Sequence, residues 1–137
     1  MKLEIGIRAS RTKTITDSDI RAFAEASGDT NPVHLDDAYA ATTQFGRRIA
    51  HGMLTASLIS AILGNDLPGP GTIYLGQEVK FKAPVFLDDT ITATIELIKY
   101  REDRRIATFR TTCENQDGTL VLDGEAVVIT PEGEGTG

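Results

Sequence analysis

The first half of the chain carries apolar residues at the spacing of three and four positions that is typical of helices. In residues 16–28 this spacing predicts an amphipathic helix. Thr16 is the expected N-cap, Asp19 completes a capping box, and Gly28 is expected to end the helix in the left-handed conformation. A second, short helix is predicted over residues 36–43. The apolar stripe of the first helix consists of Ile20, Phe23 and Ala24.

Residues 51–64 show a different pattern, because their apolar side chains cover more than one face of a helix. A helix that is apolar nearly all round is expected to be buried, and Gly64 is its expected end. The longest apolar stretch, residues 53–63, is too short to span a bilayer. The large apolar residues of this helix are Met53, Leu54, Leu58, Ile59, Ile62 and Leu63.

From residue 72 onward the apolar period changes to two, which is typical of strands with one buried face. A turn at residues 116–118 separates the last two of these strands. Long strands with short connections predict an antiparallel meander. The predicted strands cover residues 3–10, 72–85, 90–100, 105–115 and 120–130. The expected buried face of the third strand consists of Ile91, Ala93, Ile95 and Leu97.

One buried helix and a long antiparallel sheet favour an α+β domain in which the sheet wraps around the helix. This arrangement is the hot-dog fold. The chain of 137 residues fits one domain, and no repeat or linker divides residues 1–137. Residues 131–137 are rich in glycine and acidic side chains, so we expect them to form a frayed tail.

Composition and charge exclude several classes of function. The formal net charge of −6 argues against a general nucleic-acid binder. Cys113 is the only cysteine, so we expect a buried thiol and no disulfide framework. With two histidines dispersed along the sequence, we also expect no metal site. The first residues lack the apolar core of a signal peptide, so we expect a cytoplasmic protein with no membrane partner.

Residues 27–37 combine turn residues with side chains that perform acid–base chemistry. Pro32 fixes its own φ angle and restrains Asn31, so the loop between Asp29 and His34 is stiff. A stiff loop can aim both side chains at one water molecule and let them move its protons, while Asn31 orients either partner. The alternative is that Asp29 only shapes a turn and His34 is only packed.

The chain resembles the MaoC-like (R)-specific enoyl-CoA hydratases, a branch of the hot-dog superfamily. Residues 28–34 read Gly-Asp-Thr-Asn-Pro-Val-His and are followed, after five residues, by Ala40, which is similar to the family's signature. Residues 45–58 resemble the start of the family's central helix, and residues 77–91 resemble its next strand. The resemblance, over residues 16–130, implies a homodimer that needs no cofactor. It also implies reversible hydration of trans-2-enoyl-CoA to (R)-3-hydroxyacyl-CoA.

Such a hydration needs a base for the water that attacks C3, a proton for C2, and donors that stabilise the thioester oxygen. Asp29 and His34 are the expected acid–base pair. The resemblance assigns the oxygen to the backbone N–H of Gly52, at a helix start where N–H groups lack partners and negative charge is favoured. His51 either touches the substrate or is simply a polar residue at the helix entrance, and the second interpretation is the favoured one.

Further residues are candidates for binding the substrate. By the resemblance Ser60, Leu63 and Val128 line the acyl pocket, and the alternative for each is plain core. Because Leu63 and Val128 are bulky, we expect short acyl chains to be preferred. Lys80 and Lys82, on one face of a strand, are candidates for the CoA phosphates, and the alternative is a solvated face.

Other functions stay open at this point. A hot-dog thioesterase would cleave the thioester, but such enzymes usually carry a carboxylate on or near the central helix, and residues 53–63 contain none. A non-catalytic acyl-CoA-binding subunit of a heteromeric dehydratase would lack Asp29 or His34, and both are present. A carrier-protein thioester is an alternative to the CoA substrate. Arg47 and Arg48 have the same two interpretations as the lysines.

Overall fold

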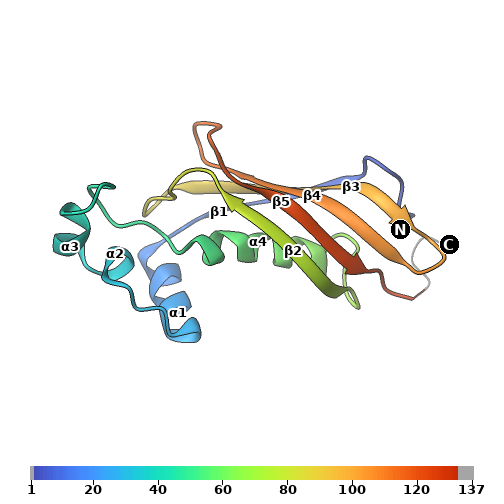
Figure 1. Cartoon of the computed structure of the whole chain (residues 1–137), viewed down its shortest axis with the longest axis horizontal. Helices are drawn as coiled ribbons and strands as arrows, with labels where there is room; N and C mark the ends of the chain where they lie inside the picture. The colour runs from blue at the N-terminus through green and yellow to red at the C-terminus, as the bar shows by residue number, and fades with distance from the viewer. Residues whose placement is uncertain (1, 133–137) are drawn as a thin grey trace.

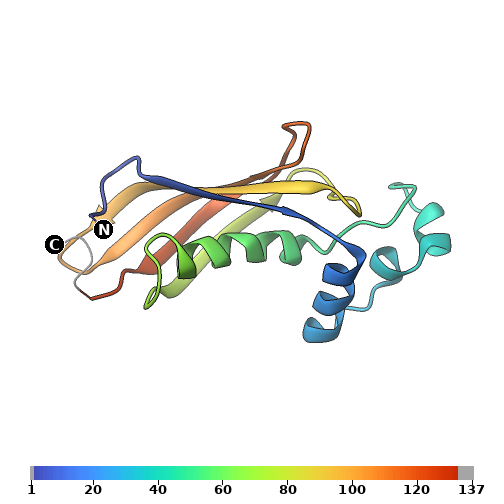
Figure 2. The same cartoon turned by 180° about the vertical axis from the view of Figure 1, so that it is seen from behind.

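The computed structural model describes residues 2–132 and consists of a long antiparallel sheet with one helix against its inner face (Figure 1). The strands are β1 (Arg8–Thr14), β2 (Ile73–Phe81), β3 (Thr90–Arg101), β4 (Ile106–Glu114) and β5 (Leu120–Ile129). The helices are α1 (Asp17–Ser27), α2 (Pro32–Leu35), α3 (Asp37–Ala41) and α4 (Gly52–Asn65). The first three gather beyond one end of the sheet, at the start of α4 (Figure 2). The expected α+β hot-dog architecture is confirmed.

The order of the strands is β1-β3-β4-β5-β2, with antiparallel pairing throughout. The predicted meander is right for β3, β4 and β5 but wrong for β2, which lies at the far edge beside β5. The reason is the connection over residues 82–89, which crosses the entrance of α4. There the N–H of Ala50 donates to the carbonyl of Val85 at 2.7 Å, and Ile49 pairs with Phe86.

The core lies between the sheet and α4. The predicted inner face of β3 is confirmed, because all four of its residues have 0% exposure. Cys113 on β4 is buried in the same layer, and burial raises the pKa of its thiol to about 12. Gly124 on β5 lets β2 approach, because a Cβ at this position would lie 1.8 Å from the backbone oxygen of Glu78. The β3 face consists of Ile91, Ala93, Ile95 and Leu97.

Helix α4 is buried on the side of the sheet and open on the other side. Its inner face includes Ile59, Ile62 and Leu63, all at most 1% exposed. The expectation of burial all round is wrong for the opposite stripe, where Met53 is 59% exposed. Gly64 does not end the helix, which continues to Asn65. The open stripe, called the α4 stripe below, consists of Met53, Ser57, Ser60 and Gly64.

The helix termini at the N-terminal end follow the sequence closely. Thr16 caps α1 with the predicted capping box, and Gly28 ends it with a φ of 80°. The second predicted helix is α3, capped by Asp36. The four-residue α2 was not predicted. The first strand starts at Arg8, five residues later than expected, because the chain before it turns at Gly6 with a φ of 96°.

Of the expected frayed tail, Pro131 and Glu132 are described, and residues 133–137 lie outside the described residues. Among residues 2–132, no helix is both long enough and apolar enough to cross a membrane.

Candidate active site

The loop between α1 and α3 is organised by its own side chains. The N–H of Asn31 donates to Oδ1 of Asp29 at 3.2 Å, and Oδ1 of Asn31 accepts from the N–H of Val33 at 3.2 Å. Asn31 therefore caps α2, with Pro32 as its first residue. Asn31 contacts Asp29 through its backbone N–H. Its side-chain amide bonds to Val33 within the loop and does not orient the imidazole of His34.

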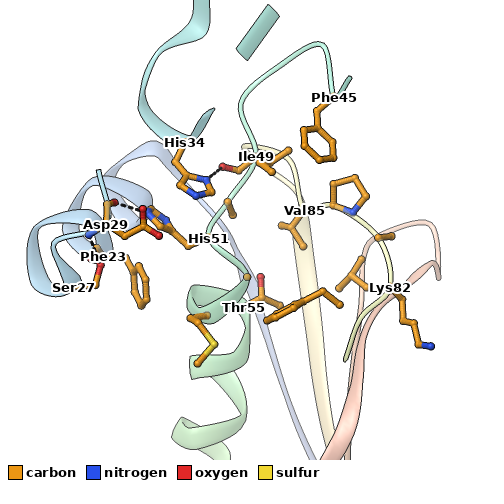
Figure 3. Close-up of a pocket in the computed structure, with 17 residues that line it drawn as sticks. Phe23, Ser27, Asp29, His34, Phe45, Ile49, His51, Thr55, Lys82 and Val85 are labelled. Atoms are coloured by element: carbon orange, nitrogen blue, oxygen red, sulfur yellow. Dashed lines mark hydrogen bonds between the residues drawn. The ribbon is translucent and has the colours of Figure 1, made fainter. Parts of the chain in front are cut away.

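His34 lies on α2, and its ring is turned into the molecule (Figure 3). Nδ1 of His34 lies 2.7 Å from the carbonyl oxygen of Ile49, which can only accept, so Nδ1 carries a proton. In the neutral ring Nε2 is then the basic nitrogen. The residue is 8% exposed, and burial is the main cause that lowers the pKa of His34 below 6.5. The ring is therefore neutral at physiological pH, with Nε2 able to take a proton.

His51 joins the same cluster, which the sequence did not predict. Its ring stacks on the ring of His34 with centroids 3.9 Å apart, and Nε2 lies 2.9 Å from the backbone oxygen of Asp29. The two histidines are 17 positions apart in the chain, so no local pattern could have signalled the contact. The only signal was its place directly before Gly52.

The carboxylate and the two rings meet at one point. One carboxylate oxygen of Asp29 and one nitrogen each of His34 and His51 lie within 4.8 Å of one another. A water molecule forms hydrogen bonds of about 2.8 Å, so it can bridge two polar atoms separated by up to about 5.6 Å. Asp29 and His34 are thus close enough to hold one water molecule between them.

This cluster opens into a cavity of about 620 Å³ at the start of α4 (Figure 3). Gly52 is the first residue of α4 and lines the cavity, so its N–H belongs to the helix terminus that lacks intrahelical acceptors. A Cβ at this position would lie 2.7 Å from the ring of Phe81, so any other residue would have to displace that ring. One turn further, the buried hydroxyl of Thr55 has no hydrogen-bond partner among residues 2–132.

Arg48 holds the loop that contains Asp29 and His34 through a hydrogen bond to its backbone. It is 5% exposed, and its Nε donates to the backbone oxygen of His34 at 2.7 Å. Its guanidinium also pairs with Asp17, and this contact lowers the pKa of that carboxyl. The guanidinium of Arg48 is therefore buried and bonded to groups of the protein, so Arg48 is not a solvated side chain. Arg47 lies over the ring of Phe86, 3.9 Å from its centroid.

The remaining predicted binding residues are scattered. Lys82 lines the cavity of Asp29 and His34, whereas Lys80 borders a different hollow on the outer face of the sheet. Leu63 and Val128 are buried in the core, at most 1% exposed, and line neither of these two cavities. Ser60 lines a further cavity along the α4 stripe.

The cluster also consists of residue types that bind metal ions. The expectation of no metal site rested on the distance between the histidines in the sequence, yet in space their rings stack. Nδ1 of His34 and Nε2 of His51 are each bonded to a backbone carbonyl, which leaves one nitrogen per ring for any other contact. The absence of a metal stays a prediction.

The fold and the acid–base cluster at the helix entrance define a hot-dog domain of the hydratase and dehydratase type. The chain belongs to the MaoC-like family, whose domain, described as "MaoC like domain", matches residues 2–118.

The chain is 53% identical to the (R)-specific enoyl-CoA hydratase of Rhodospirillum rubrum, over 92% of this chain and 87% of that protein. It is 47% identical to the 3-hydroxybutyryl-CoA dehydratase of Methylorubrum extorquens, over 96% and 83%. Its structure matches the (R)-hydratase of Aeromonas caviae with a TM-score of 0.92 at 52% identity, over 94% of this chain and 98% of that one.

The buried environment of His34 predicts its titration. Because burial disfavours the charged ring, we expect proton NMR to give His34 a pKa below 6.5. As the pH falls, His34 therefore takes up its proton in the unfolded chain before it does so in the folded protein. The contribution of neutral His34 to stability is present above about pH 6.5 and is lost as the pH falls below that value. His34→Gln should flatten the loss of unfolding free energy between about pH 7 and 5.

The acidic side chains act in a separate range, because the pKa of Asp17 is lowered from 3.8. The variant Asp17→Asn serves as the control, because it should still lose unfolding free energy between about pH 7 and 5 as the native protein does. A measured pKa of His34 at or above the free value would contradict the assignment.

Proposed function

We propose that this protein is an (R)-specific enoyl-CoA hydratase that adds water reversibly to trans-2-enoyl-CoA, with Asp29 and His34 as its acid–base pair. The observation that carries the proposal is the meeting of these two side chains within 4.8 Å, in a cavity that also contains the start of α4. The hydratase names of relatives at 53% and 52% identity support the reaction class.

In the proposed reaction, Asp29 and His34 hold a water molecule over C3 of the enoyl group. The neutral His34 has a basic Nε2, and the carboxylate of Asp29 is a second acceptor, so the water can be deprotonated as it attacks. The proton then passes to C2. All atoms of one water molecule end up in the (R)-3-hydroxyacyl product, and the reverse sequence is dehydration.

The thioester oxygen gains negative charge during this attack. We assign its stabilisation to the N–H of Gly52, at the positive end of the α4 dipole. One such donor is worth about 3–4 kcal/mol in comparable oxyanion sites. Most of the side chains that line the cavity around it are apolar, and an apolar surrounding strengthens such an interaction.

The carrier of the acyl group is proposed to be CoA. Lys82 supports this, because it lines the cavity and can reach a phosphate, whereas Lys80 is further from the site on the outer face. A carrier-protein thioester is the second candidate. It is favoured by 36% identity to the mitochondrial 3-hydroxyacyl-[acyl-carrier-protein] dehydratase of Arabidopsis thaliana, over 94% of this chain and 78% of that protein.

Asp29→Asn tests the acid–base pair. Asn has nearly the same size and turn preference as Asp but cannot accept the proton of water. With crotonyl-CoA as substrate, we expect kcat to fall by about 10²–10⁴ with little change in Tm. His34→Ala should also lose activity, and the double variant should be scarcely slower than the slower single variant, because paired groups act as a unit.

The assay follows the enoyl absorbance, with chiral analysis of the product and a parallel measurement of free thiol. A fully active Asp29→Asn enzyme would show that the loop is only a turn. Release of thiol without hydration would identify a thioesterase instead.

A homodimer is proposed as the assembled form. β2 is an edge strand of the sheet, and three apolar side chains in succession, Ile73, Tyr74 and Leu75, are exposed along it. Met53 of the α4 stripe is exposed as well, so apolar side chains lie beside the unpaired backbone groups of an edge strand, and a second copy can cover them by joining sheets. The cytoplasmic location expected from the sequence stays a prediction.

Light scattering should give twice the chain mass of 14.8 kDa at about micromolar concentration. Leu75→Asp places a charge in the proposed contact and should yield a monomer. Ile5→Asp is the control, since Ile5 is 66% exposed and lies outside β2. A monomeric native protein, or equal effects of both variants, would refute this dimer.

The acyl chain is proposed to run from the acid–base pair along the α4 stripe toward Ser60, with Leu63 and Val128 limiting its length. The support is that Phe23 and Met53 line both the first cavity and the cavity that contains Ser60, so the two adjoin. Leu63 and Val128 lie behind this path, inside the core.

Leu63→Ala should raise the relative activity on longer enoyl-CoA chains and cost about 2–5 kcal/mol of stability. Leu97→Ala, at an equally buried position of β3, should cost similar stability without moving the chain-length profile. If Leu63→Ala also leaves the chain-length profile unchanged, Leu63 is a residue of the hydrophobic core and does not limit the acyl chain. Rates on a series of enoyl-CoA lengths and urea denaturation supply both measurements.

A further inference from the structure

His51 occupies the N-cap position of α4, yet its side chain makes no hydrogen bond to the start of that helix. A residue present only to terminate the helix would use its side chain to accept from a free N–H of the first turn. The ring of His51 is instead 2% exposed and lies among the catalytic groups (Figure 3). The role of the His51 ring therefore lies in its contacts with Asp29 and His34 and not in capping the helix.

Two contacts define what the ring does. Nε2 lies 2.9 Å from the backbone oxygen of Asp29, and because a carbonyl only accepts, Nε2 carries the proton. The face of the ring stacks on His34 at 3.9 Å with an interplanar angle of 29°. One side chain thus touches both members of the acid–base pair, the first through its peptide and the second through its ring.

The contact matters because Asp29 has few others. Asp29 is exposed, and its recorded bonds other than this one join it to Ser27 and Asn31 within the same loop. Among residues 2–132, the bond from His51 is the one hydrogen bond that joins Asp29 to the entrance of α4. It therefore ties the peptide of Asp29 to the entrance of α4, directly beside Gly52.

The ring is kept at a cost to stability. Its Nδ1 is buried and has no hydrogen-bond partner among residues 2–132. A buried acceptor without a donor is unfavourable, so an apolar ring of similar shape would fill this space at least as well. The hydrogen bond from Nε2, and not packing alone, is what distinguishes histidine at this position.

We propose that His51 is a positioning residue of the active site: its Nε2–H holds the Asp29 peptide while its ring supports His34, so that the acid–base pair keeps a fixed place beside Gly52. The proposal rests on the proposed hydratase function. His51 transfers no proton in this scheme and acts through Asp29 and His34. The stacking neighbour is also one of the causes that lower the pKa of His34, after burial.

Three variants separate the hydrogen bond from the packing. His51→Phe keeps a flat ring against His34 but removes the donor. His51→Gln places an amide N–H close to the former Nε2 and keeps it. In His51→Asn the amide is too short to reach the Asp29 oxygen, so this polar variant replaces the Phe variant in the comparison if the latter does not fold.

With crotonyl-CoA, we expect kcat of the Phe and Asn variants to fall by about 10²-fold, because small displacements of catalytic groups have effects of this size. KM should change little, and the Gln variant should recover most of the native kcat. Tm of the Phe variant should equal or exceed that of the native protein. Equal kcat in all three variants, or a loss that follows Tm, would overturn the proposal.

The Asp29→Asn background gives the decisive comparison. If His51 acts by positioning Asp29, His51→Phe should add almost no further loss of kcat once the carboxylate is gone. Full additivity of the two losses would show an independent role and overturn the proposal. If the native enzyme does not hydrate crotonyl-CoA, the proposed function is refuted. This result does not depend on the variants, so it is distinguished from a failure of the His51 proposal.

Discussion

The packing of α4 against the inner face of the sheet is the contact on which the rest of the structure depends. Ile59, Ile62 and Leu63 are buried there against the four fully buried residues of β3. Burial of such side chains stabilises the fold by about 1.5–3 kcal/mol each. Because this contact places the start of α4 next to the crossing over residues 82–89, it also determines where Gly52 lies and where the cavity opens.

In the candidate active site, backbone carbonyls hold the side chains in place. Ile49 accepts from His34, Asp29 accepts from His51, and His34 accepts from Arg48. A carbonyl cannot donate, so the bonds of the two histidines also determine which ring nitrogen carries the proton. The short segment from Arg48 to His51 therefore orients the loop of Asp29 and His34, and through Ile49 it determines the tautomer of His34.

One face of the molecule is less complete than the rest in a single chain. Met53 on the α4 stripe and Tyr74 and Leu75 on β2 are exposed apolar side chains, and all three line the cavity that contains Ser60. Phe23 and Met53 line this cavity as well as the catalytic one. A second copy placed on this surface would enclose the acyl path, which links the proposed assembly directly to the proposed chemistry.

The sequence alone determined the features that depend on neighbouring residues. The caps Thr16 and Gly28, the alternation in β3, the existence of α4 and the turn motif around Asp29 all follow from local spacing, and the family signature follows from the same short motif. Only the tertiary structure decided the features that join distant parts of the chain. β2 lies beside β5 because the chain crosses the entrance of α4, and His51 meets Asp29 because a helix start and a loop 22 residues apart are packed together. Long-range packing leaves no periodic trace in the sequence, and for that reason these contacts could not be predicted from it.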